Sequence, residues 1–308
     1  MRVFKSLDNL PQFKDAVITI GTFDGVHKGH QKILKRIADL AKSKNGESIL
    51  VTFHPHPRFV LQPGNKDLQL LNTLEEKITL LEESGLDNLV VAPFSKEFSQ
   101  MPALAYIKDF LVKNFHPITI VIGYDHHFGI NRSGNIDLLV EYQNVFDFEV
   151  IEISKETLED IAISSTKIRN ALLAGDVESG NQLLGHPYLI GGFVTKGEQI
   201  GRTIGFPTAN IQLTVDYKLV PKTGVFAVYI YVQGKEYKGM LNIGYRPTVE
   251  GTGKTIEVNI FNFNEDIYGD EITIKLIKRL RNEQKFESLS QLKEQIAKDK
   301  EQALTLLG

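Results

Sequence analysis

The sequence predicts two domains of different class: an N-terminal α/β domain with a parallel sheet, and a mostly antiparallel β-barrel that ends in a C-terminal helix. Strand-like and helix-like stretches alternate through the first 183 residues, whereas β-rich stretches separated by turns follow one another through most of the remainder. The length of 308 residues also favours two domains, since single domains commonly hold about 100–200 residues. We therefore expect one domain at residues 1–183 and a second at residues 184–308.

In the first domain, short runs of β-branched or apolar residues predict strands, and longer stretches with helical periodicity predict helices. The predicted strands are residues 16–20, 48–53, 88–93, 118–122 and 148–153. The predicted helices are residues 30–43, 73–84, 102–114 and 136–145. Such alternation indicates a parallel sheet with helices on both faces, which binds ligands at the carboxyl ends of its strands.

In the second domain the predicted strands are separated by turns that contain Gly, Pro or Asn. These strands are residues 188–194, 225–232, 237–243, 255–263 and 271–280. We expect no helix among them before residues 290–307, which have helical periodicity and end the chain. This order of elements is typical of an antiparallel barrel or sandwich closed by a terminal helix.

The composition excludes several classes of chemistry. The chain has no cysteine, which excludes disulfides, thiolate nucleophiles and cysteine metal sites, and fits a reducing cytoplasm. No apolar run approaches the roughly 18 residues of a membrane span, and the N-terminal residues do not resemble a signal peptide. The net charge of −3 gives no overall electrostatic reason to bind nucleic acid or an anionic membrane. Seven of the eight histidines precede residue 183, so histidine-dependent chemistry is expected in the first domain.

The segment GTFDGVHKGH at residues 21–30 joins the first predicted strand to the first predicted helix. Gly21, Gly25 and Gly29 allow unusual dihedral angles and a close approach of the backbone to a ligand. His27 and His30 lie at a helix N-terminus, where free N–H groups favour phosphate. Imidazole groups there can donate hydrogen bonds to the charge that develops as phosphorus is attacked. The alternative is a glycine-rich turn with two helix-capping histidines.

This segment resembles the H-x-G-H nucleotidyltransferases and, in its longer form, the adenylyltransferase domain of bacterial riboflavin kinase/FAD synthetases. The resemblance implies a Rossmann-like domain. ISSTKIR at residues 163–169 resembles a second family segment, which holds the triphosphate, although it could be a simple helix cap. His27, His30 and Arg169 are the implied catalytic residues. The implied ATP-binding residues of this domain are Gly21, Phe23, Asp24, His27, Gly29, His30, Ser164, Thr166 and Arg169.

FHPHPR at residues 53–58 and GYDHHFG at residues 123–129 follow the second and fourth predicted strands. Both resemble flavin-binding loops of the same family. The implied flavin-binding residues are Phe53, His56, Pro57, Arg58, Tyr124, Asp125 and Phe128. The chain departs from the family at His126, where many members have an aromatic residue. A rival interpretation is a zinc site made by His54, His56, His126 and His127, but that leaves the triphosphate motifs unexplained.

GRTIGFPTAN at residues 201–210 resembles the riboflavin kinase signature G-x-P-T-A-N, although Pro-Thr-Ala-Asn alone could be a turn. The resemblance implies that Thr208 and Asn210 hold Mg²⁺, which prefers oxygen ligands, and that Glu257 is the catalytic base. Asn259 and Asn262 stand where the family usually has His and Asp. RLRNEQKF at residues 279–286 resembles the closing flavin-site segment. The implied ATP- or flavin-binding residues of the kinase are Gly205, Pro207, Thr208, Asn210, Arg279, Arg281 and Phe286.

GTGKT at residues 251–255 looks like the end of a phosphate-binding P-loop. That motif requires a glycine where this chain has Thr248, and a following helix where a strand is predicted. We expect a hairpin loop here.

Together the resemblances imply a bifunctional enzyme with riboflavin, FMN and ATP as substrates and Mg²⁺ as cofactor. The second domain would phosphorylate riboflavin to FMN, and the first would adenylylate FMN to FAD with release of pyrophosphate. No nucleic acid, membrane or obligate protein partner is indicated. Three alternatives stay open: a nucleotidyltransferase for another acceptor, an enzyme with only one of the two activities, and a flavin-binding sensor without turnover.

Overall fold

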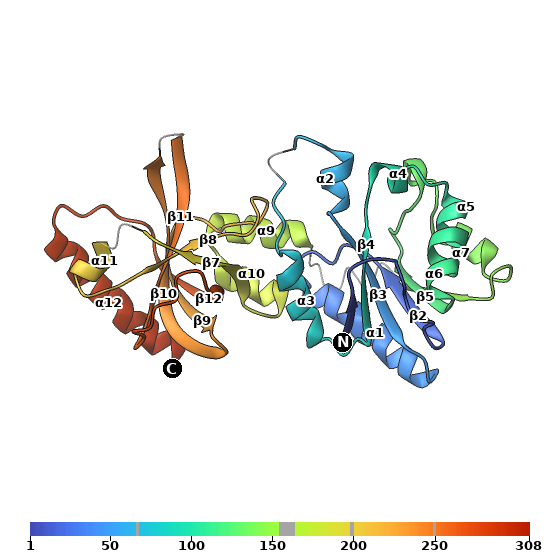
Figure 1. Ribbon diagram of the computed structural model, residues 1–308, viewed down its shortest axis with the longest axis horizontal. Helices are drawn as coiled ribbons and strands as arrows, with labels where there is room; N and C mark the ends of the chain where they lie inside the picture. Colours follow the sequence, from blue (N-terminus) through green and yellow to red (C-terminus); the bar gives the residue numbers. More distant parts are fainter. Residues whose placement is uncertain (66–67, 154–163, 198–199, 249–250) are drawn as a thin grey trace. The chain divides into compact units, whose positions relative to one another are not determined.

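The structure is a computed structural model that describes residues 1–65, 68–153, 164–197, 200–248 and 251–308. Contacts between Cα atoms divide the chain into two units, Met1–Ser164 and Ser165–Gly308. Figure 1 shows the α/β unit in blue to green and the barrel unit in yellow to red.

The first unit contains a parallel six-stranded sheet with the strand order β1-β4-β3-β2-β5-β6. The strands are β1 (Arg2–Phe4), β2 (Ala16–Ile20), β3 (Ser48–His54), β4 (Asn88–Pro93), β5 (Pro117–Gly123) and β6 (Glu149–Ile153). The helices are α1 (Lys28–Ser43), α2 (Pro57–Leu61), α3 (Leu74–Glu82), α4 (Lys96–Ser99), α5 (Ala103–Ala105), η1 (Tyr106–Val112), α6 (Lys113–Phe115), η2 (Ile130–Arg132) and α7 (Ile136–Tyr142). The predicted α/β class is confirmed.

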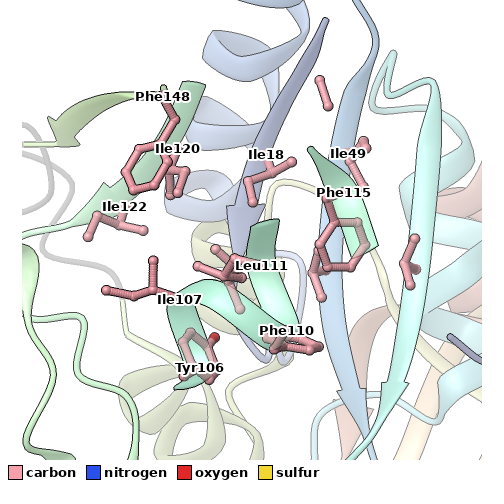
Figure 2. Packing of buried hydrophobic residues seen from close by; sticks show 14 of the residues in the cluster. Ile18, Ile49, Tyr106, Ile107, Phe110, Leu111, Phe115, Ile120, Ile122 and Phe148 are labelled. Atoms are coloured by element: carbon pink, nitrogen blue, oxygen red, sulfur yellow. The ribbon is translucent and has the colours of Figure 1, made fainter. Parts of the chain in front are cut away.

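Both faces of this sheet are buried because helices cover each of them. Ile18 and Ile49 point to one face and pack with η1, α6 and α7, as Figure 2 shows for Leu111 of η1 and Phe115 of α6. Val17 and Leu50, one residue away along the same strands, point to the other face and pack with α1 and α3. The two-residue period of a strand therefore supplies two hydrophobic cores from one apolar run.

The second unit contains a closed barrel with the strand order β10-β11-β8-β7-β12-β9. All neighbouring pairs are antiparallel. The strands are β7 (Tyr188–Thr195), β8 (Ala209–Gln212), β9 (Gly224–Val232), β10 (Lys235–Thr248), β11 (Gly251–Ile260) and β12 (Glu271–Arg281). The helices are α9 (Ser165–Ala174), α10 (Val177–Leu184), α11 (Ile200–Thr203) and α12 (Leu289–Leu307). The predicted barrel and terminal helix are confirmed.

Two expectations for the barrel are wrong. GTGKT at residues 251–255 is not a hairpin loop, because it begins β11 and pairs in register with residues 244–248 of β10. Backbone pairing forms this part of the strand, and its residues lack the apolar pattern by which a strand is predicted from sequence. The single turn of α11 also interrupts the strands before α12, and the short strand β8 follows it.

Candidate active sites

Three of the N-terminal motifs lie at one edge of the parallel sheet. The segments after β2, β3 and β5 begin at residues 21, 55 and 124, and these strands are neighbours in the order β3-β2-β5. The carboxyl ends of neighbouring parallel strands meet at the same edge, where α/β sheets bind their ligands. The topology therefore gathers the H-x-G-H segment and both predicted flavin loops.

The loop from β2 to α1 is tightly folded. Phe23, Gly25 and Val26 all have positive φ angles, of 47°, 91° and 41°. A Cβ atom at Gly21 would lie 2.8 Å from the Phe23 ring, so glycine is what allows this ring to pack under the loop. The Phe23 ring in turn lies 4.6 Å, between centroids, from the ring of His30.

His27 and His30 form a stacked pair at the start of α1. Their ring centroids are 3.7 Å apart, and the planes are inclined by 13°. His27 is the N-cap of α1, because its Nδ1 atom accepts a hydrogen bond of 3.3 Å from the backbone N–H of His30. Burial, with electrostatic contributions from the neighbouring His27 and Lys77, holds the pKa of His30 well below its usual value. His30 is thus neutral at pH 7, and its buried Nδ1 atom has no hydrogen-bond partner among the described residues.

Hydrogen bonds of Asp24 and Lys77 hold the loop in place. The buried Asp24 carboxylate accepts hydrogen bonds from the backbone N–H groups of Leu71, at 2.9 Å, and Asn72, at 3.3 Å. Lys77 on α3 donates to the carbonyl oxygen of Thr22 at 2.6 Å. Burial lowers the pKa of Lys77 to about 8, although the charge of Asp24 opposes this shift. Sequence reasoning missed Lys77; its only signal is a cation at a helix position that shares a face with apolar residues.

The first predicted flavin loop lies on an aromatic cluster. Phe53 is half-buried, and its ring contacts those of Phe94, Phe98 and Phe110. His56 caps α2 by accepting a hydrogen bond of 3.2 Å from the backbone N–H of Arg58. Pro57 is the first residue of α2, and Arg58 is exposed.

The second predicted flavin loop has exposed and buried members. Tyr124 and Asp125 are exposed, whereas Phe128 is 6% exposed and stacks on the core residue Tyr106, with ring centroids 4.7 Å apart. Burial lowers the pKa of His126 to about 4. Within the described residues, no three His, Cys, Asp or Glu side chains are gathered as metal ligands, so the zinc alternative has no support.

The triphosphate segment lies where the two units meet along the sequence. Ile163 is outside the described residues, and Ser164 is the last residue of the first unit. Thr166 and Arg169 are on α9 and so belong to the second unit.

Glu257 lines a cavity of about 380 Å³ in the barrel unit. It lies on β11, directly opposite Asn210 on β8 and Asn242 on β10. Residues directly opposite in antiparallel strands point to the same face, so these three side chains form a row across the sheet. Thr208 donates a hydrogen bond of 3.5 Å from Oγ1 to Oε2 of Glu257. The structure thus brings Thr208 and Asn210 of the GRTIGFPTAN motif together with Glu257 from a segment about 50 residues later.

A second cavity of about 460 Å³ lies next to the first, and Thr208 lines both. Its lining includes Arg202 and Pro207 with the acidic residues Glu265 and Asp266. Glu257 is a lining residue of the first cavity. A ligand in either cavity can therefore contact Thr208.

Close backbone packing fixes the segment between the cavities. Gly201 has no room for a Cβ atom, because the carbonyl oxygen of Phe206 occupies that position. The Phe206 N–H donates back to the Gly201 carbonyl oxygen at 2.8 Å. Asn259 Nδ2 donates to the Pro207 carbonyl oxygen at 2.6 Å. Gly205 has a φ angle of 86°, which explains a glycine at that turn.

The side chains of Arg279 and Arg281 have different surroundings, although the two residues are only two positions apart on β12. Arg281 lines the first cavity with Phe286. Arg279 donates to the carbonyl oxygen of Thr223 and packs on Phe226, and it is not among the residues that line the cavity. A register shift between them pairs Arg279 with Phe226 and Arg281 with Val225. This bulge reverses the face to which one arginine points.

Comparisons with known proteins assign these two units. A family model described as FAD synthetase matches residues 10–167, and one described as riboflavin kinase matches residues 184–307. The bifunctional riboflavin kinase/FMN adenylyltransferase of Bacillus subtilis (strain 168) is 40% identical, over 94% of this chain and 92% of its own length. The chain belongs to this family. The enzyme of the same name from Escherichia coli (strain K12) is 36% identical over 100% of this chain and 98% of its own.

A crystal structure from Streptococcus pneumoniae, described as a macrolide-efflux protein, matches with a TM-score of 0.85 and 33% identity over 97% of both chains. The two proteins therefore share one fold over nearly their whole length. Within the described ranges, no helix of the present chain is long and apolar enough to cross a membrane. The family models and the curated relatives agree on riboflavin kinase and FAD synthetase domains, so the chain is a transferase with both activities.

Sequence reasoning missed several residues that surround the predicted ones. In the barrel these are Asn242 and Asp299, which line the first cavity together with Asn259, the residue that stands at a family position. Asn242 had one available signal, since it lies in a predicted strand beside apolar neighbours. The place of Asp299 depends on how α12 packs, and helical periodicity alone gives no sign of it.

Proposed function

We propose that residues 184–308 phosphorylate riboflavin and that residues 1–183 adenylylate the resulting FMN. The observation that carries the kinase site is the place of Glu257, which shares one cavity with Arg281 and Phe286 and lies within 3.5 Å of Thr208. A carboxylate that lines a ligand cavity can accept a proton from a bound alcohol. Val225, Leu241 and Phe286 line the same cavity and suit a flat apolar ring system.

In the kinase reaction, the 5′-hydroxyl oxygen of riboflavin attacks the γ-phosphorus of ATP. Glu257 accepts the hydroxyl proton as the new O–P bond forms, and the bond to the β–γ bridging oxygen breaks to release ADP. We assign riboflavin to the first cavity and ATP to the second, because Thr208 borders both and the γ-phosphate must reach the hydroxyl. Catalysis then depends chiefly on positioning and on neutralising phosphate charge.

Kinases and nucleotidyltransferases that act on ATP generally need a divalent metal ion. We assign Mg²⁺ to Thr208 and Asn210, whose hydroxyl and amide oxygens are the hard donors that this ion prefers. The proximity of the Glu257 carboxylate to Thr208 also makes this point of the barrel favourable for a cation. Bound Mg²⁺ would offset the negative charge of the phosphates.

In the adenylyltransferase reaction, an FMN phosphate oxygen attacks the α-phosphorus of ATP, and pyrophosphate leaves. That phosphate is already an anion, so no protein base is needed. The neutral His30 and the stacked His27 are suited to donating hydrogen bonds to the phosphates, at a helix N-terminus that already favours anions. We assign Arg169, Thr166 and Ser164 to the triphosphate and the loops after β3 and β5 to the flavin.

Two single variants test the assignment of the two sites. Glu257→Gln removes the proton acceptor, so we expect at least a 100-fold loss of FMN formation from riboflavin, with FAD synthesis from supplied FMN unchanged. His30→Ala should produce the opposite pattern. Both rates are measured by incubation with ATP and Mg²⁺ and chromatographic separation of the flavins. If either substitution abolished both activities in a folded protein, the two-site assignment would be wrong.

We place the enzyme in the cytoplasm. The absence of cysteine from the chain fits a reducing compartment, and both reactions consume ATP. Measuring FAD synthesis in separated cell fractions tests this placement, and activity confined to a secreted fraction would contradict it.

A further inference from the structure

A buried ion pair joins the last residue of β12 to the middle of α12. Asp299 is 2% exposed. Its carboxylate accepts hydrogen bonds from Nε of Arg281, at 3.0 and 2.9 Å, and from Nη2, at 2.8 Å. Gln295, one helical turn earlier, donates to the same carboxylate at 2.9 Å. A forked contact of this kind fixes the plane of a guanidinium group as well as its position.

Arg281 is consequently held rigid at the wall of the first cavity. Its Cζ atom lies 5.8 Å from the centroid of the Phe286 ring, and its Nη1 atom donates to the Asn282 carbonyl oxygen at 3.0 Å. Of the five N–H groups of a guanidinium, these bonds use one on each nitrogen. Within the described part of the chain, the second N–H of Nη1 and that of Nη2 have no acceptor. They are available to a ligand in the cavity.

We propose that Asp299 is a positioning residue of the kinase, which acts through Arg281 to set the orientation of riboflavin. This inference rests on the proposed function, in which the first cavity holds riboflavin. The flavin ring carries carbonyl oxygens that can accept the two remaining N–H groups. Since the ribityl hydroxyl of the same molecule must reach Glu257, a guanidinium that turned freely would let the hydroxyl leave the base.

The ion pair is not needed merely to attach α12. The helix is held near its C-terminus by burial of Ala303 and Leu307 against the barrel, and Tyr229 donates from its hydroxyl to the Leu307 carbonyl oxygen at 2.7 Å. A buried ion pair also gains little net stability, because desolvation of both charges offsets their attraction. A pair retained at the cavity wall therefore points to a role in ligand orientation.

Asp299→Asn tests the proposal in the full-length enzyme. The amide keeps the shape of the side chain but cannot accept the fork as a charged partner. We expect the KM for riboflavin to rise about tenfold, with kcat within about threefold of the parent and the KM for ATP unchanged. FAD synthesis from supplied FMN, measured in the same protein, should not change. Glu301→Gln is the matched control, because it removes an exposed carboxylate from the same helix.

A double variant separates orientation from stability. Arg281→Met with Asp299→Leu replaces the pair by apolar side chains, which commonly leaves stability unchanged or improved. We expect a parental melting temperature together with a raised KM for riboflavin. Recovery of the parental KM in this variant would show that the pair is only structural and would overturn the proposal, as would an unchanged KM in a folded Asp299→Asn enzyme. If Asp299→Asn does not fold, the double variant alone decides. Absence of FMN formation by the parent enzyme would instead refute the proposed function.

Discussion

Lys77 shows how a single buried cation can shape the loop that we propose to bind phosphate. Its ammonium group donates to the Thr22 carbonyl oxygen, is affected by the charge of Asp24 and helps to lower the pKa of His30. A charged group in this position costs desolvation energy. We interpret that cost as part of preparing a loop that receives the negative charge of a triphosphate.

The lowered pKa of Lys77 predicts how stability depends on pH. The folded protein releases this proton near pH 8, whereas an unfolded lysine keeps it until about pH 10.4. The unfolded state therefore binds more protons between these values, so the contribution of Lys77 to the free energy of unfolding rises with pH, by on the order of 3 kcal/mol.

Comparison with Lys77→Met isolates this contribution. Urea denaturation of the first unit is followed by far-UV circular dichroism at pH 7.5 and 10. The free energy of unfolding of the parent, minus that of the variant, should be larger at pH 10 than at pH 7.5. A difference that stayed constant between the two pH values would mean that Lys77 is not buried as a strained cation.

At the scale of elements, the fold of the segment from Phe128 to Gly134 requires glycine at position 134. Phe128 and Gly134 form an isolated antiparallel bridge, with hydrogen bonds of 3.0 and 2.9 Å between their backbones. A Cβ atom at Gly134 would overlap the Phe128 ring. The bridge therefore lets the loop after β5 close over its own aromatic residue.

Gly134→Ala is expected to destabilise the first unit by about 1–3 kcal/mol, which is usual for overpacking. FAD synthesis should fall, because this loop borders the proposed flavin site, while FMN formation in the barrel should not. Adding Phe128→Leu, which removes the obstructing ring atoms, should recover part of the stability. A Gly134→Ala protein as stable as its parent, by thermal denaturation, would contradict the packing argument.

The elements also show what the sequence can and cannot predict. Ala16–Ile20 and Asn88–Pro93 were predicted to the residue, because fully buried strands bounded by turns leave a continuous apolar run. The opposite directions of Arg279 and Arg281 could not be predicted, since a bulge is a property of pairing with β9. Likewise, β8 is too short to show a pattern and exists because β7 and β11 offer it partners.

The candidate sites followed the same division. Motif residues such as His27, His30 and Glu257 can be proposed from the sequence because their neighbours in sequence carry the signal. Lys77 and Asp299 contact their partners from elements far away in the chain. Their spatial partners are decided by tertiary packing, so the local sequence does not show which loop or cavity they reach.

For the whole molecule, two activities in one chain imply that FMN made by the barrel serves the other domain. A mixture of Glu257→Gln and His30→Ala enzymes should therefore convert riboflavin to FAD, because FMN released by the second variant can bind to the first. Chromatography of the flavins over time checks this, with each variant alone as the control. No FAD from the mixture, despite one intact activity in each variant, would contradict free release of FMN.

The division of the chain by contacts carries a consequence for how such a protein could be split. Thr166 and Arg169, which we assign to adenylyl transfer, lie on α9. The Leu172 carbonyl oxygen of α9 accepts from the Lys222 N–H at 3.1 Å, and Asn181 of α10 donates to the Leu276 carbonyl oxygen at 2.8 Å, so both helices contact the barrel unit. A gene cut at residue 164 would give a compact first product without its proposed arginine. A cut after α10 would keep the arginine but leave two helices without the strands they rest on. Gene fission into two single-activity proteins would thus require new surface residues on these helices, which favours retention of the fused gene.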